Sequence, residues 1–168
     1  LSKEKVNNQN FEYSLKIFIN LIPIIIFLLF PFYSYILKIW LSESYNDEIL
    51  NLTKIFSLCV IFSCASHILV TKFEATKSLN RNLKIELILM PFFLIFLILL
   101  ISMKFSLITI SILILIKEYV LFIVRLNFLK DDVKNFKEFY FYSIFLLVIL
   151  FLSFFSKNLF YISTVIFI

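Results

Sequence analysis

The chain has 168 residues, of which 62% are hydrophobic and 16% charged, and its formal net charge is +5. Soluble domains contain about 45–50% apolar residues, so this composition and a mean hydropathy of +1.02 exclude a water-soluble globular protein. Basic loops of a membrane protein account for the net charge, so no nucleic-acid partner is expected. Glycine is absent, which excludes a glycine-rich phosphate loop. One histidine and the separated Cys59 and Cys64 predict no metal site, and no pattern predicts a cofactor.

Continuous apolar runs recur along the chain, and each approaches the length of about 20 residues that crosses about 30 Å of hydrocarbon. They predict an all-α, polytopic transmembrane helix bundle of about five complete spans and a truncated sixth. We expect a polar cytoplasmic segment at 1–14 and a transmembrane domain at 15–168. The expected spans are 15–41, 49–70, 85–101, 107–124, 139–155 and 159–168. Because the chain starts at Leu1 and the last run is short, we expect a C-terminal fragment of a longer protein.

The basic residues orient these spans, because short cytoplasmic loops retain Lys and Arg. One side carries Lys3, Lys5, Lys16, Lys72, Lys77, Arg81, Lys84, Arg125, Lys130, Lys134 and Lys137. The other side carries only Lys38, Lys104 and Lys157. This asymmetry predicts a cytoplasmic N-terminus. We expect the cytoplasmic basic residues that face lipid, and so contact anionic phospholipid headgroups, to be Lys72, Lys77, Arg81, Lys84, Arg125 and Lys130.

Lys117 and Glu118 lie inside the fourth span. The apolar run before them, Phe105–Ile116, measures about 18 Å as a helix and is too short to cross the hydrocarbon, so the span must continue through both charges. Each charge costs about 2.5–3.5 kcal/mol at the centre of a span, whereas each Leu, Ile or Phe returns about 0.3–0.6 kcal/mol. Adjacent residues point about 100° apart on a helix, so we expect the two charges not to pair with each other. Charges of this kind often mark a transport pathway. The alternative is that Lys117 extends toward the headgroups while Glu118 meets a basic loop residue.

Three stretches resemble the Wzx-type polysaccharide (O-antigen) flippases of the multidrug/oligosaccharidyl-lipid/polysaccharide exporter superfamily. Tyr35–Leu58 is similar to the family's Leu-Trp-Leu-Gly turn and following helix, and Phe73–Phe93 to its cytoplasmic segment. Phe105–Val124 falls where the family has Tyr-Gly-x-x-Gly-Ala-Ala and a helix containing arginine, and Lys117 stands where that arginine often stands. The best matches are Trp40, Ala75, Lys77 and Glu86. The sequence also departs from the family. Ser42 replaces a glycine, Ser78 or a neighbour replaces another, and Ser106 and Thr109 replace the Tyr-Gly-x-x-Gly pair.

The resemblance implies one lobe of a two-lobe transporter and not an enzyme. Such a protein moves a polyprenyl-pyrophosphate-linked oligosaccharide across the bacterial inner membrane for polysaccharide, including lipopolysaccharide, biosynthesis. The resemblance also implies that Lys117 faces the pyrophosphate or a sugar carboxylate, and that Glu118 holds Lys117 in place or carries a coupling proton. Partners would be the lipid-linked oligosaccharide, the phospholipid membrane and other polysaccharide-assembly membrane proteins. Three alternatives stay open: an O-polysaccharide polymerase, a drug/cation exporter of the same superfamily, and a non-transporting membrane subunit.

Overall fold

The computed structural model describes residues 2–76 and 78–130, and after these residues 137, 139–141, 143–145 and 148. This part of the chain is helical between short turns and contains no strand, which confirms the predicted all-α class. The elements are α1 (Ser2–Leu41), the short 3-10 helix η1 (Ser42–Ser44), α2 (Asp47–Ala75), α3 (Leu79–Ser102) and α4 (Leu107–Phe128). All four α-helices are long and apolar enough to cross a membrane. The predicted spans 139–155 and 159–168 lie mostly or wholly outside the described residues.

The helices extend beyond the apolar runs that predicted them. α1 begins at Ser2, although its apolar run was expected to begin at Leu15, and α4 continues to Phe128. Helical hydrogen bonds form equally well between polar residues, so a helix ends at a local stop signal and not where hydrophobicity ends. α1 therefore measures about 60 Å, twice the hydrocarbon thickness of about 30 Å, and we expect its polar beginning to lie outside the hydrocarbon.

Local signals fix the turns between the helices. The Asn46 side chain caps α2 by accepting a hydrogen bond from the Ile49 amide at 2.8 Å, and the Ser106 side chain caps α4 by accepting from the Thr109 amide at 3.3 Å. Ser42 and Lys104 have φ angles of 50° and 56°, in the left-handed region that glycine favours. These turns adopt the backbone of glycine turns in a chain that has no glycine.

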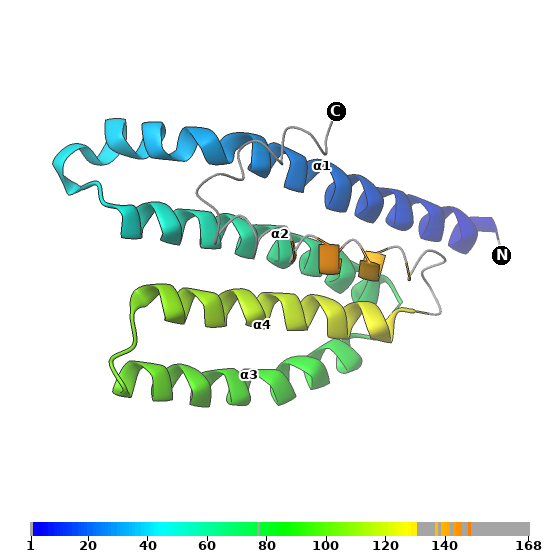
Figure 1. The fold of residues 1–168 in the computed structure, drawn as a ribbon. Helices are drawn as coiled ribbons and strands as arrows, with labels where there is room; N and C mark the ends of the chain where they lie inside the picture. The colour runs from blue at the N-terminus through cyan, green and yellow to red at the C-terminus, as the bar shows by residue number, and fades with distance from the viewer. Residues whose placement is uncertain are drawn as a thin grey trace.

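The helices lie side by side, with α2 between α1 and α4, and with α3 on the other side of α4 (Figure 1). α2 is the most buried of the four helices. Within its most apolar stretch 44% is buried inside the bundle, whereas the corresponding share for α3 is 6%. The core consists of buried side chains from all four helices and from residues after them: Leu15, Ile19, Leu58, Ile61, Phe62, Ala65, Leu69, Phe73, Ile85, Leu121, Phe122, Leu126, Leu129 and Phe139. The outward faces of α1 and α3 are apolar and exposed, as expected for helices that contact lipid.

The helix directions alternate, which separates the two ends of the bundle. The beginning of α1, the α2–α3 turn and the end of α4 lie at one end, and the α1–α2 and α3–α4 turns lie at the other (Figure 1). The first end carries Arg81, Lys84, Arg125 and Lys130, whereas Lys38 and Lys104 lie toward the second. The fold therefore gathers these charges at the ends to which the span assignment allotted them.

Candidate functional site

Lys117 and Glu118 lie in the middle of α4. At about 1.5 Å per residue, Lys117 is about 15 Å from the start of the helix at Leu107 and about 17 Å from its end at Phe128. The helix, about 33 Å long, is close to the thickness of the hydrocarbon core. If α4 crosses the membrane, these two charges are therefore as far from both headgroup layers as the helix allows.

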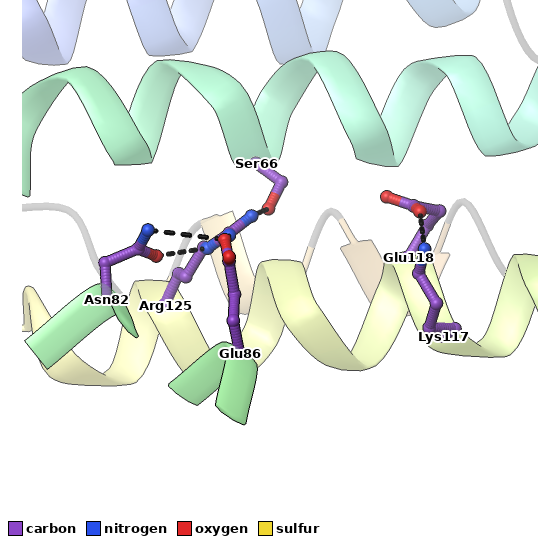
Figure 2. A network of polar contacts seen from close by, with 6 residues as sticks. All are labelled: Ser66, Asn82, Glu86, Lys117, Glu118 and Arg125. Atoms are coloured by element: carbon purple, nitrogen blue, oxygen red, sulfur yellow. Dashed lines mark hydrogen bonds and ion pairs between the residues drawn. The ribbon is translucent and has the colours of Figure 1, made fainter. Parts of the chain in front are cut away.

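The two side chains pair with each other. Lys117 Nζ lies 2.7 Å from Glu118 Oε1, and the side chains are 19% and 14% exposed (Figure 2). The expectation that they would not pair was wrong. The angle of about 100° between adjacent residues describes their Cα–Cβ directions, whereas a lysine and a glutamate carry their charges on long flexible stems that bend toward each other. In an apolar environment this contact supplies each charge with the partner it requires.

The surroundings of this pair come from α2, α3 and α4. The Lys117 ammonium lies over the Phe93 ring of α3, 5.2 Å from its centroid, which is a cation–π distance. Next to the pair, Tyr119 packs edge-to-face on Phe62 of α2 at 5.2 Å between ring centroids. Phe93 is about 21 Å from the start of α3, so the ammonium is held at mid-helix depth. In this structure Lys117 does not extend toward the end of the bundle.

A second cluster surrounds Arg125, in the last turn of α4. Its Nε donates to Asn82 Oδ1 of α3 at 2.8 Å, and its Nη1 donates to Ser66 Oγ of α2 at 2.5 Å. Its Nη2 forms an ion pair and hydrogen bond with Glu86 Oε1, which also accepts from the Asn82 side-chain amide (Figure 2). Arg125 is 6% exposed. The guanidinium thus joins three helices through one buried group.

This position corrects the prediction that Arg125 faces lipid. Arg125 lies one turn beyond Leu121 and Phe122 on the face of α4 that packs inward, so its side chain enters the bundle, where Glu86 offers a counter-charge. Lys72 is a second correction, because it is 7% exposed and its ammonium lies 5.5 Å from the centroid of the Phe11 ring of α1. Arg81, Lys84 and Lys130 are exposed, whereas Lys77 lies outside the described residues.

The sequence contains a pattern that predicts the Arg125 cluster, although a count of basic residues on each side of the membrane does not detect it. Asn82 and Glu86 are four residues apart and therefore lie on one face of a helix, at the start of an apolar run. Glu118, Phe122 and Arg125 share a face in the same way. Polar pairs on matching faces of two apolar helices indicate a contact between those helices, since each side chain needs a partner in lipid.

Both clusters join a cation to a carboxylate, and each ion pair has no formal net charge. In the described residues no group of three or more His, Cys, Asp or Glu side chains could hold a metal ion. Charge exchange is the chemistry these clusters can perform: a ligand anion can replace a carboxylate, or a ligand cation can replace a lysine or arginine. The Lys117–Glu118 pair is the better candidate because, among the contacts seen, Lys117 has Glu118 as its one hydrogen-bonding partner, whereas Arg125 also donates to Asn82 and Ser66.

The fold and these clusters define a helical membrane protein with charged groups inside its bundle. No protein-family model matches the chain, and comparisons with curated proteins and with solved structures also found no match.

Proposed function

We propose that this chain is part of a membrane transporter that moves a polyprenyl-pyrophosphate-linked oligosaccharide across the bacterial inner membrane by alternating access. The observation that carries the proposal is the Lys117–Glu118 ion pair, halfway along a helix of membrane-spanning length and incompletely covered. Ionisable residues inside a membrane are costly, and those that persist commonly line a substrate or ion pathway. The resemblance of Tyr35–Leu58, Phe73–Phe93 and Phe105–Val124 to the flippases supports the substrate class.

In this proposal Lys117 binds the substrate anion and, when it does so, its ion pair with Glu118 breaks. Between transport events Glu118 neutralises Lys117, at 2.7 Å, so that no unpaired charge lies in the hydrocarbon. A pyrophosphate is a stronger acceptor than one carboxylate, and it replaces Glu118 as the partner of the ammonium. The released Glu118 then takes up a coupling proton. In such a cycle Lys117 and Glu118 need separate polar partners only while the substrate is bound.

The proposal includes an orientation and partners. The end of the bundle that carries Arg81, Lys84 and Lys130 faces the cytoplasm, and these exposed residues contact anionic phospholipids. The N-terminus of the chain is then cytoplasmic as well. Other membrane proteins of polysaccharide assembly would supply the lipid-linked substrate and take up the product. The chain itself binds and moves the substrate and forms no covalent bond with it.

A cation exporter is the second candidate, and a specific observation favours it. Glu118 is an acid at mid-span, and its neighbourhood contains the rings of Phe93, Tyr119 and Phe62. An acid beside aromatic rings is the arrangement that binds organic cations. In that case the substrate cation replaces Lys117 on Glu118, and Glu118 becomes the essential residue.

The test replaces Lys117 or Glu118 in the source organism and measures surface polysaccharide together with the amount of the protein. For the flippase we expect Lys117→Ala to reduce surface polysaccharide strongly at an unchanged protein amount. Lys104→Ala is the matched control, because it removes an exposed lysine from the α3–α4 turn and should leave export unchanged. Normal export by Lys117→Ala would refute the role of Lys117. Loss of cationic-drug resistance in Glu118→Gln, with normal polysaccharide, would favour the cation exporter.

A further inference from the structure

α3 is attached to the rest of the bundle at its two ends. At its far end the short turn at 103–106 connects it directly to α4. At its near end the α2–α3 turn connects it to α2, where the Ser78 amide donates to the Phe73 carbonyl at 2.9 Å. Beyond that turn the Arg125 cluster and Ile85, which is 4% exposed, hold the helix against the bundle. Only Asn82 and Ile85 are buried within α3, so most of the helix has little packing that would fix its position.

The charges of the cluster are covered unequally. The Arg125 side chain is 7% exposed, but the side chain of its counter-charge Glu86 is 38% exposed. Arg125 also donates to Ser66 of α2, and this bond does not involve α3. If the part of α3 beyond the α2–α3 turn moves away, Arg125 keeps Ser66 as an acceptor while Asn82 and Glu86 leave together. The partly exposed Glu86 carboxylate can then be hydrated or bound by another cation.

Pro91 lies between the two attachments. Proline has no amide hydrogen, so the Leu87 carbonyl lacks its helical partner, and helices bend most readily at such a position. The buried residues of α3 precede Pro91 and none follows it, whereas exposed apolar residues lie on both sides of the proline. The proline therefore separates a latched half from a half that contacts α4 through the turn at 103–106 and through Phe93, which lies under the Lys117 ammonium.

We propose that Arg125, Asn82 and Glu86 form a releasable latch, and that its opening lets the segment of α3 between the α2–α3 turn and Pro91 bend away from the α2–α4 pair. This device does not depend on the identity of a transported substrate. In a transporter it would close one end of a pathway beside α4. While the latch is closed, the Arg125 guanidinium occupies the space between α2, α3 and α4.

The test measures how accessible position 85 is. Ile85→Cys is introduced into the full chain, with Cys59→Ala and Cys64→Ala to remove the other thiols, and the protein in lipid vesicles is labelled with a small maleimide. Glu86→Gln should accelerate labelling by about tenfold or more, the change expected from the loss of one charge-assisted hydrogen bond. Asn82→Asp, which offers Arg125 a second carboxylate, should slow labelling.

Glu118→Gln is the matched control, because it makes the same chemical change to the other ion pair of α4. It should leave labelling of position 85 unchanged. Equal acceleration by Glu86→Gln and Glu118→Gln would show general loosening and overturn the latch, as would no effect of Glu86→Gln. Hydrogen exchange of the backbone provides a second readout that needs no cysteine. Glu86→Gln should accelerate exchange at 79–90 and not at 107–115, and equal exchange in both segments would also overturn the proposal.

Discussion

The two ion pairs of α4 differ in where their partners lie. Glu118 and Lys117 are neighbours on one helix, whereas Arg125 binds Ser66 of α2 and Asn82 and Glu86 of α3. Lys117 and Arg125 are eight residues apart, so they lie about 12 Å apart along the helix axis. The first pair can therefore break without separating helices, but the second cannot break in this way unless helices move.

The role of a charge inside an apolar helix therefore depends on where its partner lies. A pair on one helix neutralises its own charges, contributes little to the positions of other helices, and remains available for exchange. A pair between helices determines how those helices pack, because a buried charge without its partner is costly. From charge and burial alone, Lys117 and Arg125 would have been assigned the same role.

The largest expected effect follows from removing Arg125. Arg125→Ala removes the group that joins three helices and leaves the buried Ser66 and Asn82 side chains without their donor, so the free energy of unfolding should fall by about 2–6 kcal/mol. Thermal unfolding in detergent, followed by circular dichroism, measures this change. Lys130→Ala removes an exposed basic residue from the same end of the bundle and should change stability little. If both variants unfold alike, Arg125 does not join the helices.

An effect of opposite sign is expected at the other pair. The double variant Lys117→Leu, Glu118→Leu removes both charges from the middle of α4, and replacing a buried ion pair with apolar residues is neutral or stabilises by about 1–4 kcal/mol. The protein should therefore fold at least as well, while the transport proposed above should be lost. Strong destabilisation in the same unfolding measurement would show that this pair supports the fold.

The smallest expected effect concerns the α3–α4 turn. Lys104 has a φ angle of 56°, and the Phe105 amide donates to the Leu100 carbonyl at 3.1 Å, the bond that closes a helix end at a left-handed residue. Lys104→Gly should raise the free energy of unfolding by about 1 kcal/mol, because glycine adopts this conformation without the clash of a Cβ. Met103→Gly, at a φ angle of −83°, is the matched control and should not stabilise. Stabilisation by both variants would exclude this cause.

The sequence predicted the four described helices because long apolar runs leave few other structures possible in a membrane. The beginning of α1 and the end of α4 were not predicted, since capping and turn residues, and not hydropathy, determine where a helix starts and stops. The pairing of Lys117 with Glu118 was excluded by an argument from backbone direction that neglected the length of both side chains. Arg125 was assigned to a loop because it follows an apolar run, and only its spacing from Phe122 and Glu118 indicated an inward side chain.

The most direct test of the difference between the two pairs compares the unfolding midpoints of Glu86→Gln and Glu118→Gln. Both changes replace a carboxylate with an amide of nearly the same shape, and both leave a cation of α4 without its counter-charge. We expect a clearly lower midpoint for Glu86→Gln and a smaller change for Glu118→Gln, since of these two carboxylates only Glu86 joins α3 to α4. An equal or larger loss of stability in Glu118→Gln would contradict the division of roles.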